Sequence, residues 1–202
     1  MQPTHKAIVG ITPEAAWHQF KGYEVLECPV RLLAIRGYQL KGGLTEGNDV
    51  EWYDDFIAIL EGPEKCKGYR ASVDPTRRDI KEPINPDGCA RLRLGPHWFA
   101  PGMHRGQRAF VQHGPVNVDR LDKDGRAVGI QNGEFAINIH SGGSDLEDTQ
   151  TWSAGCQVIY SPEGAWGATW LDFEERLLSA LERARQTKFP YLLVDKLKTL
   201  PL

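Results

Sequence analysis

Glycine and proline interrupt this chain so often that every apolar segment is short, and this spacing constrains the fold more than any other feature. The 202 residues include 21 glycines and 13 prolines, which mark turns between elements of secondary structure. The short apolar segments between them are typical of strands. We therefore expect strands at residues 25–30, 31–38, 55–61, 69–73, 91–94, 109–113, 135–139 and 157–160.

One segment has the period of a helix instead. Residues 170–186 place apolar side chains on one face and charged side chains opposite, as in a helix that covers a sheet. The apolar stripe consists of Leu171, Phe173, Leu177, Leu178 and Leu181. A strand-like segment follows at residues 189–195. A shorter helix is expected at residues 13–20, with Thr12 as its N-cap and Pro13 in its first turn.

Two other segments connect strands. Residues 118–129 carry Asp-Gly at the centre of a polar turn, which predicts a β-hairpin. Residues 74–107 are rich in Pro, Gly, Arg and His, and indicate a long irregular connection. These features together predict a mostly β domain of the α+β class with one long helix near its C-terminus. We assign residues 51–202 to this domain, and expect residues 1–50 to pack on it or to form part of it.

Charge and hydropathy exclude two classes of partner. The formal net charge is −3 and no basic stripe is present, so nucleic acid is not expected. No apolar run approaches the roughly 18 residues of a membrane-spanning helix. The first twenty residues lack the features of a secretory signal. We therefore expect synthesis in the cytoplasm, with release by a phage or export as an effector if the protein acts in the periplasm or cell wall.

The strongest functional signal is the segment FAINIHSGGSDLEDTQTWSAGCQVI, residues 135–159. One apolar run ends at His140, and Cys156 directly precedes another. If the two strands are neighbours, the thiol and the imidazole come within the roughly 3 Å that a nucleophile and its base require. The carbonyl of Ser141 or of a neighbour could orient the ring. Ala154 and Gly155 leave backbone N–H groups approachable, and such groups can stabilise an oxyanion.

The pattern His140-Ser141-Gly142, a gap, then Ser153-x-Gly155-Cys156 resembles the signature of the L,D-transpeptidase (YkuD-type) catalytic domain. The resemblance implies a β-sandwich or barrel-like fold for residues 51–202. It also implies that Cys156 attacks an amide next to meso-diaminopimelate in a peptidoglycan stem peptide. His140 would then activate the thiol, and the Ser141 carbonyl would orient the ring.

One position departs from the family pattern. The family arginine two residues after the cysteine is Val158 here. That arginine usually contacts a carboxylate of the substrate, so another cation has to take its place. The sequence offers Arg105, Arg108 and Arg91 as replacements.

The expected function is that of a cysteine-type peptidoglycan peptidase or transpeptidase, needing no cofactor and no metal. An acyl-enzyme would form through Cys156, with the backbone N–H groups of Gly155 and Cys156 as the oxyanion hole. We favour hydrolysis over transfer, in a lytic protein such as a phage endolysin or a toxic effector. The residues expected to contact the stem peptide are Ser153, Ala154, Asn138, His113 and Arg105.

Two other functions remain open. A zinc-dependent peptidoglycan peptidase could use His97, His104 and His113 together with His140, since imidazole is a standard zinc ligand. A chelator would inhibit that enzyme, whereas alkylation would inhibit a thiol enzyme. The second possibility is a non-catalytic cell-wall-binding or virion protein of the same fold, which the missing arginine at Val158 favours.

Overall fold

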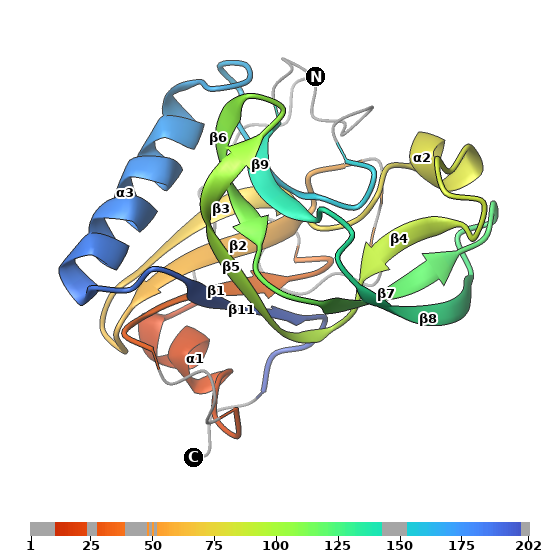
Figure 1. Cartoon of the computed structure of the whole chain (residues 1–202). Coiled ribbons are helices and arrows are strands. Elements are labelled where there is room, and N and C mark those ends of the chain that lie inside the picture. Colours follow the sequence, from red (N-terminus) through yellow and green to blue (C-terminus); the bar gives the residue numbers. More distant parts are fainter. Residues whose placement is uncertain are drawn as a thin grey trace, which may run out of the picture.

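The structure is a computed structural model that describes residues 11–23, 28–38, 48, 50, 52–142 and 153–198. Its larger sheet consists of β1 (Val30–Ile35), β2 (Asp55–Glu61), β3 (Cys66–Ser72), β5 (Gly95–His104), β6 (Gln107–Gln112), β9 (Asn138–Gly142), β10 (Gln157–Tyr160) and β11 (Phe189–Val194). These strands close into a barrel in the order β1-β11-β5-β6-β9-β10-β3-β2 (Figure 1).

A second, smaller sheet lies beside the barrel (Figure 1). It consists of β4 (Cys89–Leu92), β7 (Val116–Leu121) and β8 (Ala127–Gly133), in the order β4-β7-β8. The helices of the described residues are α1 (Pro13–His18), α2 (Arg77–Lys81) and α3 (Ala168–Ala184). The protein is therefore mostly β with one long helix near its C-terminus, which confirms the expected fold class.

The N-terminal part of the chain contributes a strand to the barrel. β1 pairs in parallel with β11 and antiparallel with β2, and all six of its residues are buried. α1 and the turn that follows it pack on the outside of the barrel through Ala16 and Phe20. Thr12 caps this helix by accepting the Ala15 N–H at 3.2 Å, and Pro13 occupies its first turn, as the sequence predicts. Residues 30–35 and 55–61 thus belong to one sheet.

Several expected elements are confirmed with small shifts. β2 and β10 have the predicted bounds. The two strands expected at residues 25–30 and 31–38 are a single strand, β1; residues 24–27 and 39–40 lie outside the described part of the chain. The predicted hairpin is formed by β7 and β8, and Gly125 adopts the positive φ of 80° that its turn requires.

The irregular connection expected at residues 74–107 is wrong, because this segment contains α2, β4 and β5. Prolines disfavour a strand, since proline cannot donate to a sheet ladder, and this segment contains Pro96 and Pro101. In β5, however, residues 95–99 pair with β11 and residues 99–104 pair with β6. Each proline therefore has a strand partner on one side only. Two edge-like positions within one long strand accommodate both prolines.

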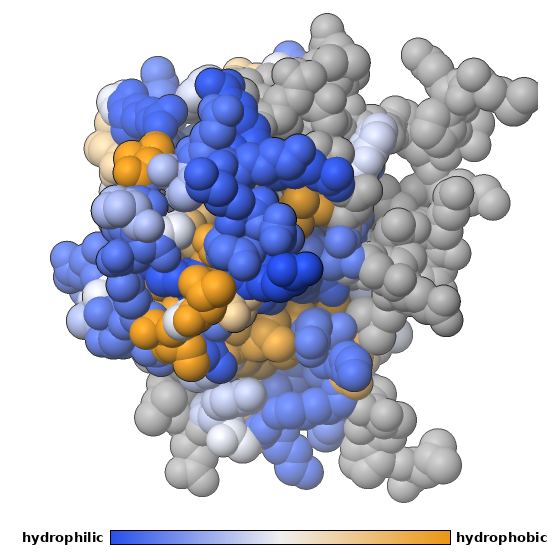
Figure 2. Space-filling view, turned by 90° about the vertical axis from the view of Figure 1, so that its right-hand side faces the viewer, coloured by the Kyte–Doolittle hydropathy of each residue, from blue (hydrophilic) through white to orange (hydrophobic). Residues whose placement is uncertain are grey.

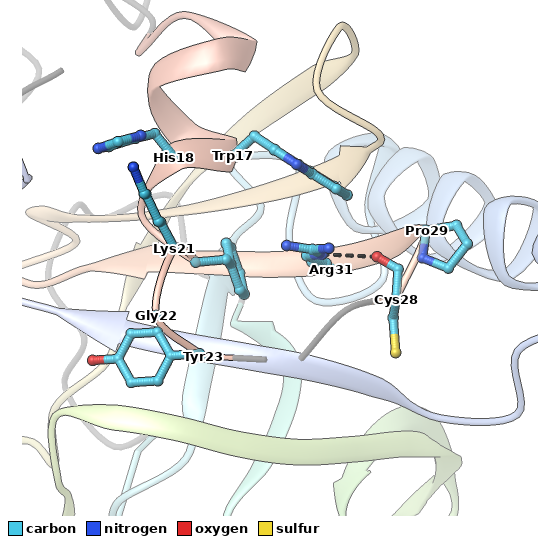
Figure 3. A pocket seen from close by; sticks show the side chains of 9 residues that line it. Trp17, His18, Lys21, Gly22, Tyr23, Cys28, Pro29 and Arg31 are labelled. Carbon is cyan, nitrogen blue, oxygen red and sulfur yellow. Dashed lines mark hydrogen bonds between the residues drawn. The ribbon is translucent and has the colours of Figure 1, made fainter. Parts of the chain in front are cut away.

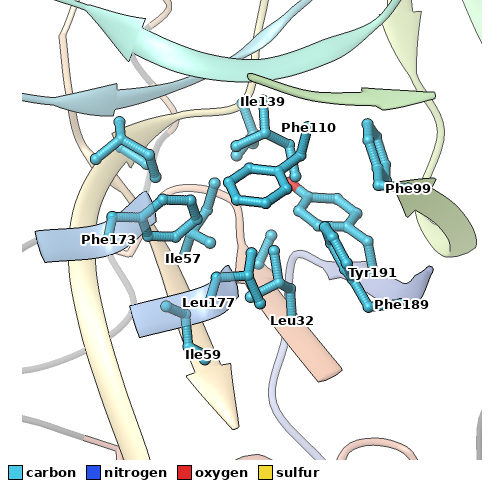
Figure 4. Close-up of a cluster of buried hydrophobic side chains, with 14 of the residues drawn as sticks. Leu32, Ile57, Ile59, Phe99, Phe110, Ile139, Phe173, Leu177, Phe189 and Tyr191 are labelled. Carbon is cyan, nitrogen blue, oxygen red and sulfur yellow. The ribbon is translucent and has the colours of Figure 1, made fainter. Parts of the chain in front are cut away.

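The main core is formed by side chains from all eight strands of the barrel together with the apolar face of α3, which packs against them (Figure 4). Leu32, Ile57 and Phe110 of the barrel contact the same apolar cluster as Phe173 and Leu177 of α3. Burial of a side chain of this size stabilises the fold by about 2 kcal/mol. The apolar face of α3 is formed by Trp170, Phe173, Leu177, Ala180 and Leu181. Leu171, which the sequence placed on that face, is 49% exposed.

Among the described residues, no helix is both long and apolar enough to cross a membrane. The face on the side of the small sheet is largely hydrophilic, with apolar patches between polar side chains (Figure 2). Val128 and Ile130 of the edge strand β8 are more than half exposed.

Candidate active site

Parallel pairing of β9 and β10 brings the two predicted catalytic side chains together. Gln157 lies opposite Ile139 and Val158 opposite His140. Continuing this register places Cys156, which directly precedes β10, beside Asn138. Alternate residues of a strand share one face, and Ile139 and Ile159 face the core. The Cys156 and His140 side chains therefore lie together on the opposite face of the sheet. His140 is in the middle of β9, not at a strand end as the sequence suggested.

A second histidine joins this pair. One ring nitrogen of His104, one of His140 and Sγ of Cys156 all lie within 4.8 Å of one another. The two imidazole rings are stacked, with centroids 4.8 Å apart and an interplanar angle of 13°. His104 ends β5 just before a two-residue turn, Arg105-Gly106, in which both residues have positive φ. That turn is of the tight hairpin kind, and it folds His104 over β9.

The neighbouring residue fixes the orientation of His140. His140 Nδ1 lies 2.8 Å from the Ser141 carbonyl oxygen, so Nδ1–H donates to it. Ser141 is itself held by its hydroxyl, which accepts the Trp166 backbone N–H at 3.1 Å. The tautomer that donates through Nδ1 leaves Nε2 with a free lone pair. His140 Nε2 is buried and has no hydrogen-bond partner in the described part of the chain.

Burial keeps both members of the pair neutral. Desolvation lowers the pKa of His140 to about 4, and the charges of His104 and Arg105 act in the same direction. The Cys156 thiol is partly exposed at its surface but crowded by protein atoms, and desolvation raises its pKa. The Asn138 backbone N–H and the Arg105 charge oppose that rise. The resting state is therefore a thiol beside a neutral imidazole, not an ion pair.

The turn before Cys156 is rigidly organised. The Ser153 hydroxyl accepts the Gly155 N–H at 3.2 Å and donates to the Cys156 carbonyl at 2.7 Å. Gly155 has φ of 129°, and a Cβ there would lie 2.5 Å from the Ala90 carbonyl oxygen. Only glycine fits this position. The Gln157 side chain donates to the Gly155 carbonyl at 3.2 Å and anchors the turn from the other side.

These contacts change the expected roles of three residues. Ser153 is fully buried and holds the turn, so it is not placed to contact a substrate. The Gly155 N–H is already bonded to Ser153, which leaves the Cys156 N–H as the expected oxyanion donor in this turn. Asn138 is buried, and its amide contacts His104 Nδ1 at 2.9 Å, so it links the site residues to each other. Ala154 is exposed and remains open to a ligand.

Of the candidate cations, Arg105 is the one beside the pair. It is exposed on the β5–β6 turn, and its charge influences both His140 and Cys156. Arg91 forms an ion pair with Asp119 at 3.4 Å, and Arg108 forms one with Glu174 at 2.9 Å. Val158, which stands where the L,D-transpeptidase signature has an arginine, is fully buried in a small cluster with Tyr53 and Tyr160.

The three-histidine site considered from the sequence does not assemble. His97 is buried, and its Nε2 contacts the Arg93 carbonyl at 2.7 Å. His113 is exposed after β6, with its backbone N–H bonded to the Trp98 carbonyl. His104 alone of the three joins His140. The part of the active-site loop at residues 143–152 lies outside the described residues, and so do the acidic side chains within it.

A separate pocket of about 870 Å³ lies beside α1 and β1 (Figure 3). The Arg31 guanidinium lies over the Trp17 ring, 3.6 Å from its centroid, and Arg31 Nε donates to the Cys28 carbonyl at 2.7 Å. This stacking packs α1 onto the barrel. None of the residues that line the pocket is among the site residues predicted from the sequence.

Comparisons with known proteins add no assignment: no family model, no curated protein and no solved structure matches the chain. The site has therefore to be interpreted from its own geometry. His104 is the member that sequence reasoning did not pair with Cys156. The available signal was the Arg105-Gly106 dipeptide, which is compatible with a tight hairpin flanked by two strands.

Acidification is expected to destabilise the fold through His140. The unfolded chain binds a proton near pH 6.5, whereas folded His140 does so near pH 4. This contribution to stability is complete above pH 6.5 and is lost as the pH falls toward 4, by about 2–3 kcal/mol. Urea unfolding in metal-free buffer gives the free energy of unfolding at about pH 7 and about pH 4.5. The decrease between these two pH values should be smaller for His140→Gln than for the wild type. Equal losses of unfolding free energy in the two proteins would contradict a buried neutral imidazole at His140. His97, whose pKa is also lowered, is present in both proteins and therefore does not affect the comparison.

Proposed function

We propose that this protein is a cysteine-dependent enzyme that cleaves or transfers acyl groups of peptidoglycan stem peptides. The observation that carries the proposal is the orientation of His140. Its Nδ1–H is bonded to the Ser141 carbonyl at 2.8 Å, its buried Nε2 has no hydrogen-bond partner among the described residues, and one of its ring nitrogens lies within 4.8 Å of Cys156 Sγ. This is the arrangement of a nucleophile, a base and a group that orients the base. The Cys156 thiol itself faces the Ala136 carbonyl oxygen at 3.7 Å, so it would have to turn toward His140 to transfer its proton.

The chemistry follows from the neutral resting pair. As Cys156 Sγ attacks the substrate carbonyl carbon, its proton passes to His140 Nε2. The carbonyl oxygen becomes an oxyanion, which the Cys156 backbone N–H stabilises. His140 then gives the proton to the leaving amine as the C–N bond breaks, and a thioester remains on Cys156. Water, or an acceptor amine, attacks the thioester after losing its proton to His140, and the thiol is regenerated.

The substrate class rests on the resemblance of His140-Ser141-Gly142 and Ser153-x-Gly155-Cys156 to the L,D-transpeptidase signature. Stem peptides carry free carboxylates, and a cation near the nucleophile would hold one of them. Arg105 supports this assignment because its charge acts on both His140 and Cys156. We infer that it takes the role of the family arginine, whose position is occupied by buried Val158.

The test is mass spectrometry of purified muropeptides incubated with the wild type and with Cys156→Ala. Loss of a terminal residue, or cleavage of a cross-link with gain of one water, is expected for the wild type alone. A product that carries an added amine in place of water would assign transfer. Equal activity in both proteins would remove Cys156 from catalysis, and binding of muropeptides without conversion would favour a non-catalytic cell-wall protein.

A further inference from the structure

His104, His140 and Cys156 present three metal-ligating side chains to one point. One ring nitrogen of each histidine and the Cys156 sulfur lie within 4.8 Å of one another. They come from three separate places in the barrel: the end of β5, the middle of β9 and the residue before β10. In a tetrahedral zinc site with bonds of 2.0–2.3 Å, ligand atoms are separated by about 3.5 Å. Side-chain rotations that shorten the separations between these three atoms by about 1 Å would reach that geometry.

We propose that these three side chains bind a Zn²⁺ ion, and that the ion inhibits the enzyme by occupying its nucleophile and base. Two imidazoles and one thiolate form a donor set typical of zinc, with a fourth position left for water. The metal binds as the Cys156 thiol loses its proton to solvent. The inhibition rests on the proposed function, whereas the binding does not.

The polar contacts around the three ligands support a metal. His140 Nε2 is buried and without a hydrogen-bond partner in the described residues, while Nδ1–H is bonded to the Ser141 carbonyl. Zinc-bound histidines are oriented in this way, with the second ring nitrogen donating to a carbonyl or carboxylate. His104 Nδ1 has the Asn138 side-chain amide at 2.9 Å. With that amide turned by 180°, its oxygen would accept an Nδ1–H and leave His104 Nε2 free to coordinate, at the cost of the 3.4 Å bond that this oxygen accepts from the Gln112 N–H.

The local charge sets the class of metal. The thiolate offsets one of the two positive charges of the ion, while exposed Arg105 nearby opposes a cation. With one anionic ligand and no carboxylate in the set, hard cations that prefer oxygen are disfavoured. The same soft donor set admits Co²⁺, which therefore serves as a spectroscopic probe for the zinc site.

The experiment titrates Co²⁺ into the metal-free full-length protein and records its absorption. A thiolate-to-cobalt charge-transfer band is expected for the wild type, and Zn²⁺ should remove it at one equivalent. Cys156→Ala should lack the band, and His104→Gln should weaken binding by about 100-fold. His113→Gln is the matched control, since His113 is exposed outside the cluster, and it should bind like the wild type. Circular dichroism checks the fold of each variant.

A readout on the wild type alone guards against variants that fail to fold. Zn²⁺ should slow the alkylation of Cys156 by iodoacetamide, mapped by mass spectrometry, without slowing that of Cys28. An absent cobalt band, or a band that persists in Cys156→Ala, would overturn the metal site. If muropeptides are converted, Zn²⁺ should inhibit at the concentration that displaces Co²⁺; activation by Zn²⁺ would overturn the inhibition. If nothing is converted, the proposed function fails and the binding result still stands.

Discussion

Cys156→Ala and His140→Ala, made singly and together, are expected to lower kcat/KM for a muropeptide substrate by the same factor, about 1,000-fold or more. In the proposed mechanism the thiol attacks only as its proton moves to His140 Nε2, because burial keeps both groups neutral. When either side chain is removed, the other can no longer contribute to catalysis. The second substitution should therefore cost almost nothing further.

The measurement is product formation by chromatography of muropeptides, with initial rates for the three variants and the wild type. Cys28→Ala and His18→Ala are the matched controls, because both residues are partly exposed and lie outside the cluster. They should retain wild-type rates. A double variant whose loss equals the product of the two single losses would show that Cys156 and His140 act independently, contrary to the mechanism above.

Gly155→Ala is expected to be the most destabilising single substitution near the site, by about 4 kcal/mol. The strain of a φ of 129° in a residue with a Cβ accounts for about half of that cost. The remainder comes from the backbone, because the new Cβ would lie 2.5 Å from the Ala90 carbonyl oxygen of β4. The turn that carries Cys156 would have to move away from the small sheet.

The control for this change is Gly95→Ala. Gly95 has a similar φ of 123°, but a Cβ there meets nothing within 4 Å. Urea unfolding should therefore give a smaller loss, about 2 kcal/mol, which isolates the strain from the clash. Gly155→Ala should also lower activity in the remaining folded protein, whereas Gly95→Ala should not. Equal losses of stability would mean that the contact with Ala90 is relieved at no cost.

Local patterns predicted much of the barrel. The bounds of β2 and β10 and the position of α3 follow from short apolar runs and from a helical period, because these signals depend on near neighbours in the chain. The same reasoning was wrong for β5. Proline acts against a strand only where its missing N–H faces a partner, and whether Pro96 and Pro101 face one depends on the register with β11 and β6.

The candidate site, too, could be predicted from the sequence only in part. Cys156 and His140 were chosen from the sequence because small residues and apolar runs place them beside strands. His104 was grouped with His140 only in the zinc alternative, and nothing local placed it beside Cys156, because that contact depends on the β5–β6 hairpin and its position next to β9. The Ser153 hydroxyl was likewise expected to face a substrate, but the closed turn directs it to the Gly155 N–H.

The sequence by itself thus determined a mostly β chain with a long C-terminal helix, and a cysteine and a histidine beside two of its strands. Periodicity and turn residues encode such features within a few positions of each other. Only the tertiary structure decided that β9 and β10 lie parallel, that His104 joins the pair, and that Val158 is buried where the family has an arginine. Those outcomes depend on the register between strands distant in sequence, which only the packing of the closed barrel fixes.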